Sequence, residues 1–177
     1  MALRGMVIVL MVFLLCAAGQ RPGRADALSP LVRSAHWLNG RVSESDVHGK
    51  VVLVDFYTFG CINCKHVEPN LRALYRSSSR ADLVILGVHS PETAYERDAA
   101  NVIASFREQG VRWPVALDND FALWNDYGIQ AWPTQLIFDR RGVLRRTIVG
   151  EGQDRIVNDT VAQLSATRSG IRSLSSQ

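Results

Sequence analysis

Two cysteines three positions apart, Cys61 and Cys64, are the residues whose types and spacing most directly suggest chemistry in this 177-residue chain. A disulfide between them would close a ring of only about four residues, so it would constrain the unfolded chain very little as a structural crosslink. A pair that cycles between two thiols and a disulfide accounts for the spacing better, because one sulfur can attack a partner and the other can release it. We therefore expect a redox-active dithiol.

The cysteine pair lies where a predicted strand meets a predicted helix. Residues 51–57 form an apolar run rich in β-branched side chains, which predicts a buried strand. Residues 62–77 carry apolar side chains at the spacing of an amphipathic helix. The free N–H groups and positive dipole end at the start of that helix favour the thiolate form of Cys61. Cys64, one turn further on, is placed to attack a mixed disulfide on Cys61.

The first 27 residues have the three parts of a secretory signal peptide. Arg4 gives a positive start, residues 5–18 form an apolar run, and Ala25-Asp26-Ala27 fits a cleavage site after Ala27. We expect export to the bacterial periplasm or another extracytoplasmic compartment. An uncleaved membrane anchor is less favoured because the run is shorter than a bilayer span. A lipid anchor on Cys16 is a further alternative, although the preceding Leu15 is bulkier than the small residue usual there.

The composition is that of an ordinary globular protein, with 47% apolar and 21% charged residues. A chain of this length has room for one domain with a sizeable core. Residues 1–27 hold Arg4, Arg21, Arg24 and Asp26, so the rest of the chain has a formal charge of +1, against +3 for the whole. Without a net positive charge or a basic stripe, no nucleic-acid partner is expected.

Strand and helix patterns alternate along the chain, which predicts an α/β fold with parallel central strands. We expect a linker over residues 28–36, one domain over 37–167 and a disordered, Ser-rich tail over 168–177. Glu92 is expected to cap a helix at its start. The other expected elements are a strand or hairpin over 37–45 with a turn at 39–40, a strand over 83–88, a helix from 90 to Gly110, a strand over 115–117, a helix capped by 118–120 that stops at Gly128, a hairpin of strands 135–138 and 143–149, and a closing helix around 156–164.

Five features in sequence order resemble the thioredoxin superfamily. They are an acid six residues before the first cysteine (Asp55), the CxxC pair itself, Lys65 after the second cysteine, Pro69 five residues beyond it, and the loop Ile129-Gln130-Ala131-Trp132-Pro133-Thr134. The resemblance implies a thioredoxin-like fold, in which helices flank a central mixed sheet. An N-terminal strand or hairpin and a helix–strand insertion over 90–117 would extend that fold.

The resemblance is closer to the exported TlpA-like branch, and within it to the soluble thioredoxin-like domain of DipZ-type proteins. The similar stretches are Trp37–Asn39, Gly49–Phe56, Cys61–Cys64, Gly87–Glu92 and Asp118–Asp120. The branch implies an exported protein thiol-disulfide oxidoreductase without a cofactor. It also implies reduction of specific clients, such as thiols that await haem in cytochrome c maturation or copper. A membrane electron donor would then be a separate chain, and we expect a monomer.

The resemblance also implies a role for each site residue. Cys61 would be the nucleophile and Cys64 the resolving thiol, while Asp55 would accept the proton of Cys64, because burial raises a carboxyl pKa toward neutral pH. The loop residues Trp132, Pro133 in the cis form and Thr134 would contact the substrate. A local role at a strand end is the alternative for Asp55. Lys65 and His66 could support the thiolate or simply be solvated.

Two departures from the family pattern leave the redox potential and the direction of electron flow open. Gly60 stands where thioredoxins usually have Trp, and Ile62-Asn63 replaces Gly-Pro between the cysteines.

Two other functions stay open. A peroxidase is one, because Thr58 and Cys61 fit the T-x-x-C half of the peroxiredoxin pattern, although Val54 replaces its proline. A Cu(I) carrier is the other, with His66 or His89 joining the two thiolates. A closed zinc site is not expected, because the chain has no second cysteine pair.

Overall fold

A computed structural model describes residues 27–34 and 36–172, with side chains as far as residue 167. The signal peptide expected over residues 1–27 therefore lies, apart from Ala27, outside the described residues. The elements in chain order are α1 (Ser29–Val32), β1 (Trp37–Leu38), α2 (Glu44–Val47), β2 (Val51–Tyr57), α3 (Ile62–Ser77), β3 (Leu83–His89), the 3-10 turn η1 (Tyr95–Arg97), α4 (Ala99–Gln109), β4 (Val115–Leu117), α5 (Ala122–Asp126), β5 (Thr134–Phe138), β6 (Leu144–Val149) and α6 (Asp154–Arg172).

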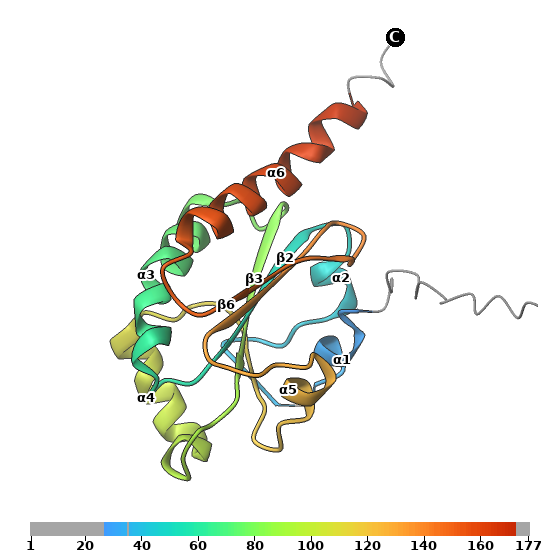
Figure 1. The fold of residues 1–177 in the computed structure, drawn as a ribbon. Coiled ribbons are helices and arrows are strands. Elements are labelled where there is room, and N and C mark those ends of the chain that lie inside the picture. The colour runs from blue at the N-terminus through green and yellow to red at the C-terminus, as the bar shows by residue number, and fades with distance from the viewer. Residues whose placement is uncertain (1–26, 35, 173–177) are drawn as a thin grey trace, which may run out of the picture.

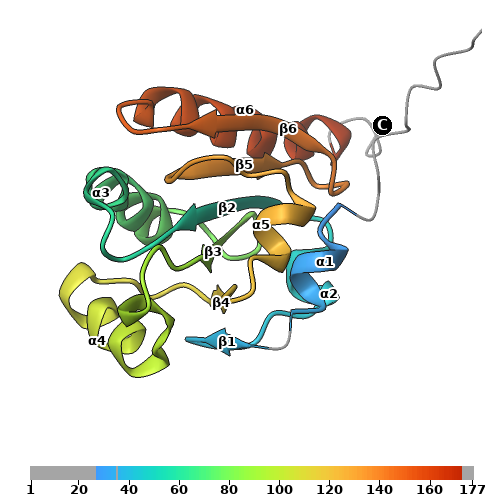
Figure 2. The same ribbon diagram turned by 60° about the horizontal axis from the view of Figure 1, so that its bottom comes forward.

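The strands form one mixed sheet in the order β1-β4-β3-β2-β5-β6, which Figure 2 shows from β6 at the top to β1 at the bottom. β2 pairs in parallel with β3 and β3 with β4, whereas β5 is antiparallel to both β2 and β6. All seven residues of β2 are buried, as expected for a central strand. The expected fold class is confirmed, and the predicted strand 51–57 and helix 62–77 match β2 and α3 residue for residue.

Helices cover both faces of the sheet, with α3, α4 and α6 on one face and α1, α2 and α5 on the other (Figures 1 and 2). Side chains alternate between the faces along a strand. Val51, Leu53 and Tyr57 of β2 join the core under α3, while Val52 and Val54 join the opposite core. By the same alternation, the residue between Val54 and Phe56 faces the α3 side. Asp55 and the helix that begins after Cys61 therefore share one face.

The helix expected to begin at Ser90 begins at Ala99 instead, so that prediction was wrong by nine residues. The carboxylate of Asp98 accepts the N–H of Ala100 at 2.7 Å and starts α4 there. Residues 90–98 form a loop with the single turn η1, in which Glu92 caps no helix. Gly110 ends α4 with a φ of 69°, as predicted.

The N-terminal part differs from the expected linker, whereas the strand alternative for residues 37–45 and the turn at 39–40 are confirmed by β1 and by the positive φ angles of Asn39 and Gly40. Leu31 of α1 is fully buried in the core beside α5, so residues 29–32 pack as part of the domain. The two-residue strand β1 pairs with β4, which is distant in the sequence. It does not form a hairpin with the residues that directly follow it. After the turn, a capping box between Ser43 and Asp46 begins α2, which is why no second strand follows. At the other end, α6 continues to Arg172, beyond the expected boundary at 167.

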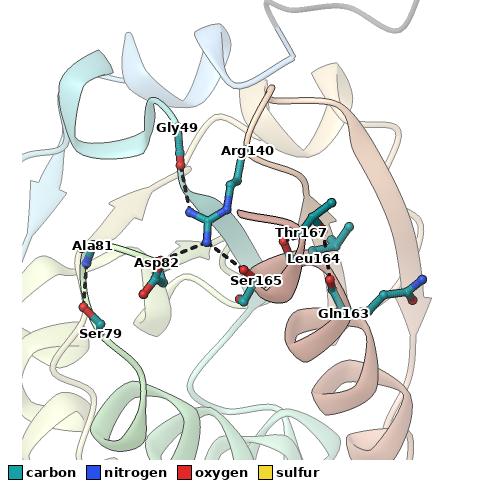
Figure 3. A network of polar contacts seen from close by, with 9 residues as sticks. All are labelled: Gly49, Ser79, Ala81, Asp82, Arg140, Gln163, Leu164, Ser165 and Thr167. Carbon is teal, nitrogen blue, oxygen red and sulfur yellow. Dashed lines mark hydrogen bonds and ion pairs between the residues drawn. The ribbon is translucent and has the colours of Figure 1, made fainter. Parts of the chain in front are cut away.

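Arg140, in the turn between β5 and β6, joins three segments at the end of the sheet where β2 and β3 begin. Its guanidinium donates to the carbonyls of Gly49 (3.0 Å) and Ser165 (3.1 Å) and to the carboxylate of Asp82 (2.9 Å), as Figure 3 shows. Gly49 precedes β2, Asp82 precedes β3, and Ser165 belongs to α6. This cluster fixes the end of the sheet opposite the cysteines.

Candidate active site

Cys61 and Cys64 lie at the carboxyl end of β2, where the chain enters α3. Cys61 is the N-cap residue of α3, and its sulfur accepts the backbone N–H of Cys64 at 3.2 Å. Both thiols are free; Cys61 is partly exposed, whereas Cys64 is 1% exposed. Hydrogen bonding by a helix-terminal N–H stabilises a thiolate. The geometry thus gives an accessible sulfur that accepts a hydrogen bond from the helix and a second, buried sulfur beside it.

The buried thiol of Cys64 is difficult to ionise. Burial raises its pKa, and a hydrogen bond to the Cys61 sulfur and the charge of Asp55 raise it further. The Asp55 side chain is itself 2% exposed, and burial raises its pKa to about 7, against the hydrogen bond from Gln135, which lowers it. A carboxyl group with that pKa exchanges protons near neutral pH. The structure therefore places an acid with a suitable proton affinity in the electrostatic field of Cys64.

A second buried acid, Glu68, also acts on this region. Glu68 is 5% exposed in α3, and burial raises its pKa to about 7, although the ion pair with Arg72 at 3.2 Å opposes the rise. Its charge raises the pKa of Asp55 in turn. Within the described residues, Oε1 of Glu68, Oδ1 of Asp55 and the hydroxyl of Tyr57 are buried without a hydrogen-bond partner. Two carboxyl groups of similar proton affinity thus lie beneath the cysteines.

Glu68 was not identified from the sequence, although a signal was present. It lies four residues after Cys64 and three before Leu71, which is the spacing of the buried face of α3. An acid on an apolar helix face is an unusual and informative position.

The expected substrate loop lies beside the same end of the sheet, because Thr134 pairs with Phe56 near the end of β2. The Trp132–Pro133 peptide bond is cis. Trp132 is half-buried and packs on Trp124, with 4.4 Å between ring centroids. The Thr134 side chain is buried, and its hydroxyl donates to the carbonyl of Ala131 at 2.7 Å. Of the three loop residues, Trp132 is therefore the one with side-chain surface to offer.

The helix–strand insertion holds the loop that carries Cys61. The amide of Gly60 donates to Glu96 Oε1 at 3.0 Å, and the amides of Glu92 and Thr93 donate to Oε2 at 2.8 and 2.7 Å. Gln109 donates to the carbonyl of Phe59 at 3.0 Å. Sequence reasoning missed Glu96, because Gly60 and Glu96 are 36 residues apart and no local pattern joins them.

A further buried side chain, His89, packs against this loop. His89 is fully buried, and burial lowers its pKa to about 4, so the ring is neutral at physiological pH. The ring stacks on Phe59 at 5.5 Å and lies 3.4 Å from the hydroxyl of Thr58 through Nε2.

The other histidine considered for the site is engaged elsewhere. His66 Nδ1 contacts Glu151 in the loop after β6. Over residues 27–34 and 36–172, no three His, Cys, Asp or Glu side chains form a group that could hold a metal ion.

Comparison with known proteins places the chain in a family. The AhpC/TSA family model matches residues 31–147. Protein DipZ of Mycobacterium tuberculosis is 35% identical over 132 residues, which are 72% of this chain and 19% of DipZ, so the chain spans about a fifth of that relative. Thiol-disulfide oxidoreductase YkuV of Bacillus subtilis is 26% identical over 131 residues, covering 73% of this chain and 88% of YkuV.

A solved structure shows the same fold. The thiol-disulfide isomerase of Corynebacterium glutamicum superposes with a TM-score of 0.69 at 22% identity, over 75% of this chain and 92% of the isomerase. Among the described helices, none has the length and apolar character needed to cross a membrane. Together, these matches show that the chain belongs to the AhpC/TSA family and has a thioredoxin-like fold.

Proposed function

We propose that this protein is an exported thiol-disulfide oxidoreductase that reduces specific protein disulfides through Cys61 and Cys64. The observation that carries the proposal is the division of labour between the two sulfurs. Cys61 is accessible and accepts a hydrogen bond from the helix, while Cys64 is buried within reach of it. A nucleophile must meet the client, whereas a resolving thiol only has to meet the nucleophile.

The proposed cycle has two displacements. The Cys61 thiolate attacks one sulfur of a client disulfide, which forms a mixed disulfide and releases the other client sulfur as a thiolate. Cys64 then gives its proton to Asp55, and its sulfur attacks Cys61, which forms the Cys61–Cys64 disulfide and releases the second client sulfur. The client gains two electrons, and this protein loses two.

The reducing direction has support in the acids beneath the pair. The charge of Asp55 opposes ionisation of Cys64, and Glu68 adds a second negative charge nearby when ionised. Surroundings that disfavour thiolates destabilise the reduced form and make a dithiol a stronger electron donor. The signal-peptide pattern of residues 1–27 supports export. We further propose that a membrane protein supplies the electrons, as the resemblance to DipZ-type proteins implies.

Partner contact would take place around Cys61. Ile62, immediately after it, is 63% exposed, and Tyr95, which packs edge-on against Phe59, is 66% exposed. With the half-buried Trp132, these side chains offer apolar surface to a client near its disulfide. We propose that Trp132 and the backbone on either side of Pro133 make the substrate contacts.

The peroxidase alternative has support from the family, because the AhpC/TSA family also includes peroxidases. Thr58 does not favour it, because the side chain is fully buried and its hydroxyl faces His89. Consumption of hydrogen peroxide by the reduced protein would support the peroxidase. Copper that co-purifies with the reduced protein would support the Cu(I) carrier.

Trapping of clients tests the proposal. With Cys64→Ser, the mixed disulfide on Cys61 cannot be resolved, so client proteins from the extracytoplasmic fraction should stay covalently attached until a reductant is added. Cys61→Ser is the matched control and should trap none. Recovery of equal amounts of attached protein from both variants, or none from either, would contradict the assigned roles.

A further inference from the structure

The insertion over residues 90–117 holds the loop before Cys61 through the buried carboxylate of Glu96. Glu96 is 3% exposed, and both of its oxygens accept backbone N–H groups. Oε1 binds the amide of Gly60, the residue before Cys61. Oε2 also accepts the hydroxyl of Thr93 at 3.1 Å. A single side chain thus ties the insertion to the residue that precedes the reactive sulfur.

The carboxylate also explains the unusual glycine. A Cβ at position 60 would fall inside van der Waals distance of Glu96 Oε1. The φ of Gly60 is not in the left-handed region, so its backbone does not require glycine. The side chain at position 60 is excluded by the carboxylate and not by the turn. A larger side chain at this position, where thioredoxins have Trp, would therefore displace the carboxylate of Glu96.

Glu96 is ionised at neutral pH despite its burial. Burial tends to raise its pKa, but hydrogen bonds from Thr58, Thr93 and Gly60 outweigh that effect and hold the pKa below its usual value. A fixed negative charge therefore stands next to the start of α3. His89, which stacks on Phe59 in the same loop, is neutral and does not cancel this charge.

We propose that Glu96 is a positioning residue for Cys61, which fixes the amide of Gly60 and makes the dithiol a stronger reductant through its negative charge. The proposal rests on the function proposed above. A negative charge beside a thiolate disfavours the reduced, ionised form relative to the disulfide. The same hydrogen bond sets where the Cys61 backbone enters the helix. The insertion then tunes the redox centre in addition to extending the fold.

The test compares Glu96→Gln with Glu92→Gln in the full chain. Both changes remove one negative charge from the same loop, but Glu92 is exposed and its carboxylate makes none of these contacts. The dithiol–disulfide equilibrium is measured in glutathione buffers by counting free thiols. Glu96→Gln should move the equilibrium about tenfold toward the dithiol, or about 30 mV. Glu92→Gln should leave it within twofold of the wild-type value.

Two results would overturn the inference. One is an equal equilibrium in both variants with a lower melting temperature for Glu96→Gln, which would make Glu96 purely structural. If Glu96→Gln does not fold, Gly60→Ala takes its place, because the added methyl group must push the carboxylate aside. A folded Gly60→Ala protein with an unchanged equilibrium is the second result. If the wild-type protein itself has no reversible equilibrium, the proposed function fails instead, so the two failures are distinguishable.

Discussion

Two polar regions at opposite ends of the sheet show how the same fold uses buried charge in different ways. At one end, Arg140 donates to three acceptors from three segments (Figure 3). At the other end, Asp55 and Glu68 are buried with carboxyl oxygens that have no hydrogen-bond partner among the described residues. A charge with several partners stabilises a structure, whereas buried carboxyl groups that each keep one oxygen without a partner take up protons near neutral pH, even though Glu68 also pairs with Arg72. The comparison separates the end that holds the fold together from the end that reacts.

The largest expected effect comes from removing the acid beneath the cysteines. The raised pKa of Asp55, about 7 against an unfolded value near 3.8, means that the native state keeps a proton that the unfolded state loses between about pH 4 and pH 7. Wild-type stability therefore falls as pH rises through this window. Asp55→Asn removes the loss, so its stability relative to wild type should grow by on the order of 3 kcal/mol from pH 4 to pH 8.

Urea unfolding of the reduced proteins at several pH values measures this difference. Asp126→Asn, an exposed acid of α5, is the control and should show no such growth. The same Asp55 variant should resolve mixed disulfides more slowly at neutral pH, because Cys64 has lost its proton acceptor. A stability difference that is constant with pH would contradict the buried, proton-binding role of Asp55.

At the opposite end, Arg140→Ala should lower stability by about 2 kcal/mol, because the carbonyls of Gly49 and Ser165 lose their donor. Arg141→Ala is the matched control, since that neighbouring side chain is 76% exposed, and it should change stability by less than about 0.5 kcal/mol. Thermal unfolding gives both values. Neither variant should change the dithiol–disulfide equilibrium. A changed equilibrium in Arg140→Ala would contradict the separate roles of the two ends of the sheet.

The smallest expected effect concerns the electrostatic interaction between Glu68 and Asp55. Glu68 raises the pKa of Asp55 through its charge, so Glu68→Gln should lower that pKa. Carboxyl carbon NMR shifts of Asp55 in the reduced protein, followed against pH, measure the change. Glu108→Gln, an exposed residue of α4, provides the control. An Asp55 titration unaffected by Glu68→Gln would mean that the two acids act independently.

The contrast between local and distant contacts also decides what could be predicted from the sequence. β2 and α3 were predicted to the residue, because an unbroken apolar run and a helical period are properties of contiguous residues. The start of α4 was misplaced, because Pro91 and Glu92 imitate a helix N-terminus while Asp98 provides the actual cap.

The placement of Cys61, Cys64 and Asp55 on one strand–helix unit could be predicted, because these residues lie close together in the sequence. Glu96 could not be predicted, since its contact with Gly60 exists only after the insertion has folded back over the cysteine loop. Glu68 could have been found from its helical position beside Leu71. The sequence does not show the burial and the contacts that set the pKa values of Glu68 and Glu96.

The most direct test of the central claim is an equilibrium redox titration of the purified protein in dithiothreitol and glutathione buffers, with free thiols counted at each potential. Our account predicts that the thiols of Cys61 and Cys64 appear and disappear together as one reversible two-electron couple. It further predicts a potential nearer the reducing thioredoxin value of about −270 mV than the oxidising value of about −120 mV. A protein in which the two thiols do not interconvert reversibly with a disulfide would contradict it.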